Sequence, residues 1–180
     1  LLNYVDGARF PDDYDYVAAE VTGRPSVLFD QAVVIAAGAE NGVRVDDPVV
    51  NEDGLVGIVA RVTARSARVQ LLTDQEAAAS AIDVRTKAPG TVLHARGTRE
   101  TLVLDRVRKE DVVRRGDEIV TAGWKEGGLS SVYPKGIPIG VVTSVNDTDT
   151  DLFKQVQVDP YVDFGMLDAV LVLVPLEPRR

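Results

Sequence analysis

The fold of this chain is decided by residues 133–145, which have the sequence YPKGIPIGVVTSV. Lys135 and Gly136 form a typical turn pair, and the β-branched run that follows is suited to a strand. Pro138 cannot donate a hydrogen bond to a neighbouring strand, and Gly140 tolerates a sharp bend or a bulge. The stretch therefore predicts a kinked strand of the kind that closes a small β-barrel.

The same design occurs earlier in the chain. Residues 43–50 (VRVDDPVV) are echoed by residues 113–120 (VRRGDEIV). The first copy is followed by 54–62 (GLVGIVARV) and the second by 136–145 (GIPIGVVTSV), so each unit has an acidic segment, a strand, a glycine turn and a kinked strand. An internal repeat of this kind indicates two related β-modules. Their predicted structural turns lie at Gly54, Gly57, Gly136 and Gly140.

Composition limits the possible functions. At 180 residues the chain has room for one large domain or two small ones. Its net charge of -8 and its pI near 4.7 argue against a sequence-independent grip on nucleic acid or on an anionic membrane surface. Cysteine is absent, which excludes disulfides and thiolate metal sites. No run reaches the roughly 18 apolar residues typical of a membrane helix.

Short strands separated by turn signals recur along the chain, and no long amphipathic helix is apparent. This pattern predicts an all-β fold of the barrel or sandwich class. Short helical turns are expected after Asp74 and at 163–167. The strands are predicted at 16–22, 32–36, 56–62, 67–73, 81–85, 91–95, 101–107, 118–121, 137–145, 155–158 and 169–174.

The search for catalytic, cofactor-binding and metal-binding residues yields no candidate. His94 is the only histidine, so a multi-histidine zinc site is excluded, and its place in a predicted strand favours a structural role. The aspartates of 147–151 (DTDTD) resemble the start of an EF-hand loop, but Leu152 and Val158 occupy the positions that require glycine and glutamate. We interpret that segment as an acidic loop, and residues 1–15 as an acidic lead-in.

Residues 122–133 are an insertion that distinguishes the second unit from the first. They contain the only tryptophan, Trp124. An aromatic side chain on a glycine-rich loop is either a lid over a small barrel's core, which we favour, or an anchor for a partner. If the loop contacts a partner, the expected contact residues are Trp124, Leu129, Val132 and Tyr133.

Several motifs together resemble the extracytoplasmic region of the rod-shape-determining MreC family. The resemblance runs from about residue 16 to residue 174, with the motifs in the family's order and with family-like spacing. They are 46–57 (DDPVVNEDGLVG), 71–74 (LLTD), 116–123 (GDEIVTAG), 133–140 (YPKGIPIG), 152–158 (LFKQVQV) and 162–164 (VDF).

The resemblance implies two small β-barrels with short helical turns. Residues 1–15 would follow a coiled coil that dimerises the protein, and the first barrel would combine 16–79 with 147–176. The second barrel would span 80–146. The repeat alone would also permit two consecutive modules. The chain begins at Leu1 and not at methionine, so we expect a processed or trimmed product.

The function implied by the resemblance is that of a non-enzymatic scaffold that maintains cell shape by organising and activating lateral peptidoglycan synthesis. The implied partners are the elongation-specific penicillin-binding transpeptidase, MreD, the MreB filament system and further copies of the chain. The implied location is the extracytoplasmic face of the bacterial cell membrane, with an N-terminal membrane helix as the anchor. The alternatives are a β-barrel that binds a ligand or an oligosaccharide, and a hydrolase built on His94.

Overall fold

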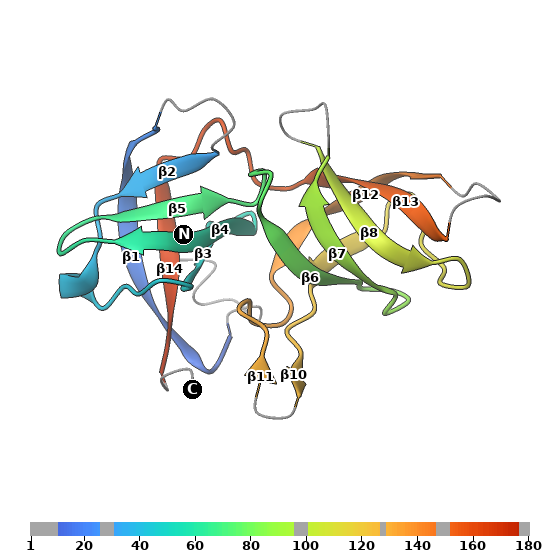
Figure 1. Cartoon of the computed structure of the whole chain (residues 1–180), viewed down its shortest axis with the longest axis horizontal. Helices are drawn as coiled ribbons and strands as arrows, with labels where there is room; N and C mark the ends of the chain where they lie inside the picture. The colour runs from blue at the N-terminus through green and yellow to red at the C-terminus, as the bar shows by residue number, and fades with distance from the viewer. Residues whose placement is uncertain (1–10, 26–30, 96–100, 127–128, 147–151, 177–180) are drawn as a thin grey trace.

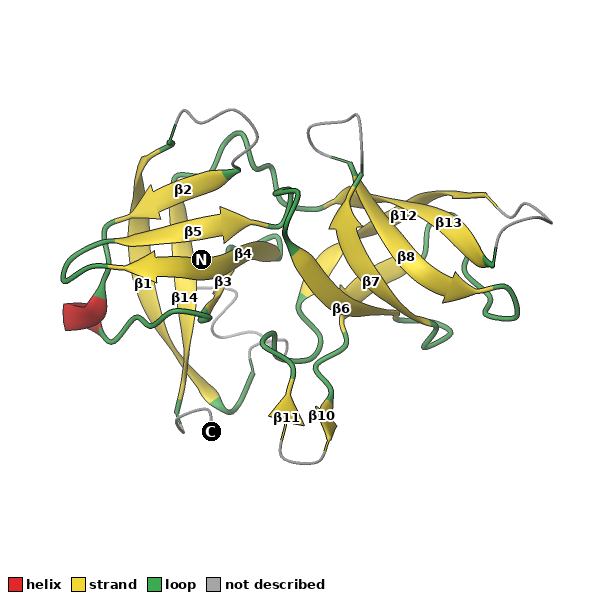
Figure 2. Ribbon diagram, in the orientation of Figure 1, coloured by secondary structure: helices red, strands yellow, loops and turns green. Residues whose placement is uncertain are grey.

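The computed structural model describes residues 11–25, 31–95, 101–126, 129–146 and 152–176, with the backbone alone for 125–126 and 129–130. These residues form two closed, six-stranded antiparallel barrels that lie side by side, and a two-stranded hairpin that projects from them (Figure 1). Figure 2 shows that nearly all of the regular secondary structure is β-strand. In the described part the helical content is one 3-10 turn, Ala39–Asn41. The predicted all-β class is confirmed.

The first barrel is closed by a strand from the far end of the chain. β14 lies between β1 and β3, with Tyr14 opposite Pro175 and Val50 opposite Leu171. Val170–Leu173 of β14 are buried in the core. The ring is β1 (Tyr14–Gly23), β14 (Ala169–Pro175), β3 (Pro48–Val50), β4 (Leu55–Val62), β5 (Ala67–Leu71) and β2 (Ala32–Ile35).

The second barrel is continuous in the chain apart from the hairpin. Its ring is β12 (Pro138–Asn146), β13 (Phe153–Pro160), β8 (Leu102–Arg108), β7 (Pro89–His94), β6 (Ala78–Asp83) and β9 (Glu118–Thr121). The projecting hairpin consists of β10 (Lys125–Glu126) and β11 (Leu129–Ser130), and it joins β9 to β12.

Two domain boundaries differ from the sequence-based expectation. We expected 147–176 in the first barrel, but β13 belongs to the second, because it forms a hairpin with β12 in which Asn146 faces Gln155. Val156 and Val158 are consequently buried in the second barrel's core. The lead-in is also shorter than expected, since β1 already begins at Tyr14.

The sequence repeat is a structural repeat. Val49 opposite Gly57 in the first barrel corresponds to Ile119 opposite Gly140 in the second. At both glycines the neighbouring strand passes so close that a side chain would collide with its backbone, at Gln70 in the first barrel and at Asp159 in the second.

The acidic residue before each repeated strand also has the same role. The Arg44 N–H donates to Asp47 Oδ2 (2.8 Å), and the Arg114 N–H donates to Asp117 Oδ2 (2.7 Å). Each aspartate also accepts, at its main-chain oxygen, an N–H from the kinked strand, Val59 in one barrel and Val142 in the other. Both repeats therefore begin with the same aspartate-closed turn.

The two helical turns predicted from the sequence are wrong. Asp74 accepts from the N–H of Glu76 and also from Gln31 and Gln70, so it holds a tight turn and the end of β5 instead of capping a helix. At 163–167 the Asp163 carboxylate accepts from the Gly165 N–H in the same way. Both aspartates stabilise turns through local hydrogen bonds that compete with helix formation.

A close contact joins the two barrels. Gly54, in the turn between β3 and β4, lies against the main-chain oxygen of Pro138 at the start of β12, where any side chain on Gly54 would collide. Tyr133, just before β12, is buried. Burial raises the pKa of Tyr133 to about 12, with a further contribution from the negative charge of Asp46 in the first barrel. The joint is therefore tightly packed.

Gly54→Ala should open this joint. The added methyl group must displace Pro138, so we expect a loss of about 1–3 kcal/mol in the free energy of unfolding. The pKa of Tyr133 should fall toward the ordinary value of about 10 as its ring gains water. Ultraviolet titration of tyrosinate, with Tyr133→Phe to assign the signal, measures that fall. Gly23→Ala is the control, since its nearest neighbour would lie 3.9 Å away. An unchanged Tyr133 titration would contradict a tight joint.

Candidate interaction surfaces

The hairpin between β9 and β12 carries the residues that the sequence singled out as a contact loop. The Ser131 N–H donates to the Trp124 main-chain oxygen (2.8 Å), which fixes the base of the hairpin. Trp124 is 47% exposed and Val132 is 37% exposed, whereas Tyr133 is buried. Leu129 lies in β11.

The favoured lid prediction is wrong for Trp124, because half of its side chain faces solvent. Its loop leaves the barrel surface immediately after β9, at Gly123, whose backbone packs against Lys135. Trp124 and Val132 thus present apolar surface beside the joint, while Tyr133 belongs to the joint itself. That this surface contacts a partner stays a prediction.

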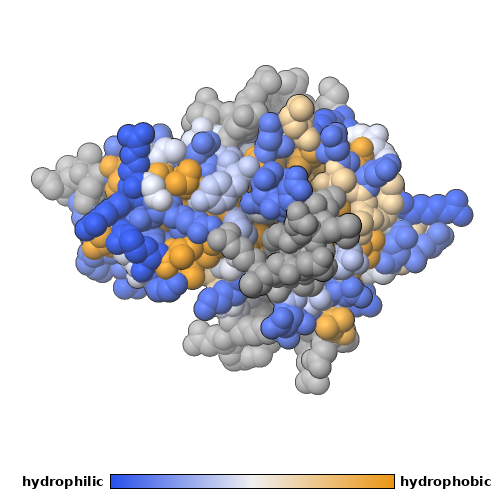
Figure 3. Space-filling view, turned by 180° about the vertical axis from the view of Figure 1, so that it is seen from behind, coloured by the Kyte–Doolittle hydropathy of each residue, from blue (hydrophilic) through white to orange (hydrophobic). Residues whose placement is uncertain are grey.

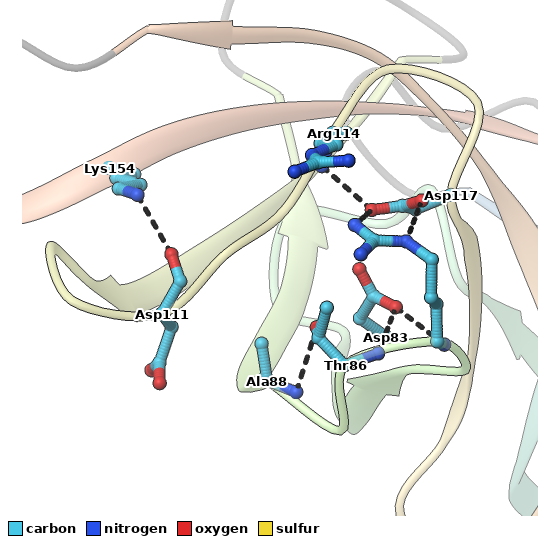
Figure 4. Close-up of polar contacts among 8 residues, drawn as sticks. Asp83, Thr86, Ala88, Asp111, Arg114, Asp117 and Lys154 are labelled. Atoms are coloured by element: carbon cyan, nitrogen blue, oxygen red, sulfur yellow. Dashed lines mark hydrogen bonds and ion pairs between the residues drawn. The ribbon is translucent and has the colours of Figure 1, made fainter.

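A second feature, missed from the sequence, is a charged cluster at the end of the second barrel. Arg85 forms a two-point ion pair with Asp117, through Nη2 (2.6 Å) and Nε (2.9 Å). The Arg85 guanidinium and the Arg114 N–H hold the pKa of Asp117 well below its usual range, against the opposing effect of burial. Figure 4 shows Asp83 directly below Asp117. The only sequence feature that could have drawn attention to Asp117 is the Arg-x-x-Asp spacing that Arg44–Asp47 and Arg114–Asp117 share.

Asp83 is the buried member of this cluster. Its Oδ1 accepts from the N–H groups of Arg85 (2.7 Å) and Thr86 (3.0 Å), whereas its buried Oδ2 has no hydrogen-bond partner among the described residues. Burial raises the pKa of Asp83, and the neighbouring Asp117 raises it further, although the two backbone hydrogen bonds oppose the shift. A proton on Asp83 would let it donate toward Asp117.

The pKa values of Asp83 and Asp117 are shifted in opposite directions, as in a catalytic acid–base pair, but the two carboxyls share no other feature with such a pair. Asp117 is neutralised by Arg85, and Asp83 is fully buried, so neither carboxyl is positioned to act on a substrate. His94 lies on β7 with a buried Nδ1 that lacks a partner among the described residues. Within the same residues no group of three or more His, Asp or Glu side chains could hold a metal ion. The acidic loop 147–151 lies outside the described residues.

Asp83→Asn should stabilise the protein at neutral pH. The amide keeps the Oδ1 acceptor and supplies a donor toward Asp117, so we expect a gain of about 1 kcal/mol at pH 7. Because the folded-state pKa of Asp83 is raised, its contribution to stability is complete below the ordinary value of 3.8 and is lost as pH rises through the folded value.

The gain from Asp83→Asn should therefore shrink toward acid pH, as measured by urea unfolding between pH 4 and pH 8. Asp159→Asn, an exposed change in the same barrel, should alter stability little at any pH. A loss of stability in Asp83→Asn at pH 7 would mean that the cluster requires a charged Asp83.

Comparison with known proteins identifies the family. The family described as "Rod shape-determining protein MreC, barrel core" matches residues 21–174. The cell shape-determining protein MreC of Haemophilus influenzae is 32% identical over 168 residues, which are 91% of this chain and 45% of that protein. The chain spans about half the length of the curated relatives it matches. None of the described helices has the length and apolarity that crossing a membrane would need.

Solved structures share the double-barrel fold. The crystal structure of MreC from Pseudomonas aeruginosa superposes with a TM-score of 0.79 at 27% identity, covering 88% of this chain and 98% of that one. Two more distant neighbours show the fold alone. One is the major periplasmic domain of the cell shape-determining filament MreC (TM-score 0.75, 23% identity, 90% and 96% covered). The other is a complex between penicillin-binding protein PBP2 and MreC from Helicobacter pylori (TM-score 0.68, 17% identity, 88% and 98% covered). By its matched sequence and its fold, the chain belongs to the MreC family of rod shape-determining proteins.

Proposed function

We propose that this chain is the extracytoplasmic part of a non-enzymatic scaffold that maintains cell shape by organising and activating lateral peptidoglycan synthesis. The observation that carries the proposal is the family match across both barrels, residues 21–174. The shared fold with the MreC chain of the PBP2 complex supports a penicillin-binding transpeptidase of the elongation machinery as the main partner.

The mechanism would be binding without bond chemistry. A scaffold activates an enzyme when it binds the active arrangement more tightly than the inactive one. A packed joint such as the Gly54–Pro138 contact suits this role, because two barrels held firmly together present one rigid surface. MreD and the MreB filaments are further proposed partners, reached through an N-terminal membrane helix. Self-association is proposed as well, supported by the filament-forming relative.

The hairpin is the proposed contact surface for the transpeptidase. Exposed aromatic residues are enriched among the few side chains that dominate binding energy at interfaces. Trp124 meets that description at the base of the hairpin, where Val132 is also exposed. Leu129 lies in β11, and the buried Tyr133 follows the hairpin in the chain.

The test is a titration of the chain against the soluble extracytoplasmic part of the cognate elongation transpeptidase at physiological salt. We expect saturable binding that a peptidoglycan fragment does not compete. Trp124→Ala should weaken it at least tenfold, the order of effect expected of a central aromatic contact. Met166→Ser, which alters an even more exposed apolar residue elsewhere, should change it little.

The outcomes separate the alternatives. Competition by the peptidoglycan fragment would favour an oligosaccharide-binding module. Equal affinities for wild type and Trp124→Ala would place the contact outside the hairpin. Absence of binding both for the chain and for a forced dimer would reject the transpeptidase as the partner. Turnover of a wall substrate that is lost in His94→Ala would overturn the non-enzymatic proposal.

A further inference from the structure

Strand β1 is paired along most of its length on one side, but only near its end on the other. β14 pairs with β1 from Tyr14 to Glu20. β2 pairs only with Val21 and Gly23, and beyond them the Ala36 N–H donates to the Glu20 main-chain oxygen (2.9 Å). The first part of β1 and the last part of β14 therefore leave the ring together as a two-stranded ribbon, at the lower end of the first barrel in Figure 1.

The main-chain groups of β1 alternate between its two sides. The Val21 N–H donates to the Asp168 main-chain oxygen (2.8 Å) in line with the β1–β14 pairing, so the odd-numbered residues of β1 face β14. Even-numbered residues face the opposite way. Tyr16 and Ala18 thus direct their main-chain groups toward a side on which the described residues place no strand. We call these groups of Tyr16 and Ala18 the open edge.

The chain's own carboxylate occupies part of the open edge. Asp15 Oδ1 accepts a hydrogen bond from the Tyr16 N–H (2.8 Å). This side-chain acceptor takes the place of the carbonyl that a neighbouring strand would bring. Charged side chains at an edge are a common means of limiting strand addition. Asp15 therefore moderates the open edge but satisfies only one of its N–H groups.

The side chains along the open edge suit a second copy of β1. Tyr16 (36% exposed) and Ala18 are exposed, whereas Val17 between them packs against the core. In an antiparallel pair centred on Val17, Tyr16 of each copy lies opposite Ala18 of the other. Both residues direct their main-chain groups to this side, so each Tyr16–Ala18 pair exchanges two hydrogen bonds. A large side chain also meets a small one on the outer face.

This register also separates the negative charges. Asp15 lies opposite Ala19 of the other copy, and Glu20 lies opposite Tyr14, so no carboxylate faces another directly. A register centred one residue earlier would place Glu20 opposite Asp12, and like charges directly opposite each other destabilise a pair of strands. The sequence of β1 is therefore complementary to itself in one register.

Net charge opposes the meeting of two copies. Residues 78–160 contain twelve Lys or Arg and twelve Asp or Glu, so the net charge of -8 belongs to the first barrel and the ends of the chain. Two copies joined at β1 bring these acidic parts together. Salt screens their repulsion and should strengthen the contact, whereas salt weakens attraction to a basic partner.

We infer that the open edge pairs with β1 of a second copy, antiparallel about Val17. The inference rests on the self-association proposed above and names its surface. Two ribbons would become one four-stranded sheet in the order β14, β1, β1, β14, which is more stable than an isolated pair of strands. The contact is two-fold symmetric, so it closes at a dimer.

Main-chain hydrogen bonds would carry this contact. Figure 3, which shows the molecule from behind with the first barrel at the right, has hydrophilic side chains interspersed with apolar ones on that barrel. Addition of a strand to an edge needs no broad apolar face, because the ladder of N–H and C=O groups supplies the affinity.

Amide hydrogen exchange of the whole chain, followed by NMR at high salt while the protein concentration is raised, tests the inference. The amides of Tyr16 and Ala18 should become protected as concentration rises. Those of Val17 and Ala19 face β14 and should be protected at every concentration. Sedimentation should show a monomer–dimer equilibrium that shifts toward the dimer as salt is added.

Variants locate the contact. Ala18→Glu should weaken dimerisation roughly tenfold, because each copy adds a carboxylate at the junction. Thr22→Glu is the matched control, since it adds the same charge to an exposed position of β1 where β2 covers the edge, and it should change dimerisation far less. Ala18→Pro should abolish the dimer but keep the fold, because the N–H it removes points away from β14. Asp15→Ala should strengthen the dimer roughly tenfold by releasing the Tyr16 N–H of both copies.

Four results would overturn the inference. They are a monomer at all concentrations at high salt, equal effects of Ala18→Glu and Thr22→Glu, association that weakens with salt, and protection of Tyr16 and Ala18 that does not depend on concentration. The last would mean that the chain covers its own edge. No transpeptidase takes part in these measurements, so their failure would leave the proposed hairpin contact standing, and a failed transpeptidase titration would leave the dimer standing.

Discussion

The pairing of β14 with β1 and β3 is the constraint on which the double-barrel structure depends. A six-stranded ring cannot close with five strands, and the first 71 residues supply only β1 to β5. Without β14, the facing edges of β1 and β3 would expose unpaired main-chain groups. The buried run Val170–Leu173 would also be lost from the core. Everything between β5 and β14 is thus an insertion within one barrel.

The two rings follow the same path. The first, starting at β3, is β3, β4, β5, β2, β1 and β14, and the second, starting at β9, is β9, β12, β13, β8, β7 and β6. β14 therefore occupies in the first ring the position that β6 occupies in the second. In chain order the second copy of the repeat begins with β6. The first copy lacks that strand at its start and takes an equivalent one from the end of the chain.

Much of this architecture could be predicted from the residues. Alternation and glycine or proline punctuation indicated the strands, and the duplicated acidic turn indicated two modules. The assignment of β13 could not be settled by pattern, because the alternation of Gln155–Val158 suits a strand with one buried face in either barrel. Pairing between strands is decided by contacts distant in sequence, and the local turns after Asp74 and Asp163 were misassigned because aspartate serves helix caps and tight turns equally well.

The surfaces were harder to predict than the fold. Asp83 and Asp117 are brought together only by the pairing of β6 with β9, which places Asp83 opposite Ile119. The exposure of Trp124 could not be read from the sequence either, because a tryptophan on a glycine-rich loop suits a buried lid as well as an exposed contact. A total charge also cannot reveal how the charge is distributed. Over the full sequence, residues 78–160 contain twelve Lys or Arg and twelve Asp or Glu, so the whole net charge of -8 falls outside the segment that forms the second barrel.

The late position of β14 also sets an order of assembly during vectorial synthesis. All six strands of the second barrel are present once residue 160 has emerged, whereas the first barrel must wait for residues 169–175. The five early strands are therefore an incomplete sheet for most of the chain's emergence, and the inserted barrel can form before its host. Because Tyr14 pairs with Pro175, a mechanical force applied at the start of β1 acts directly on the β1–β14 pairing that closes the first barrel. A chain truncated before β14 would keep one barrel and leave the other open.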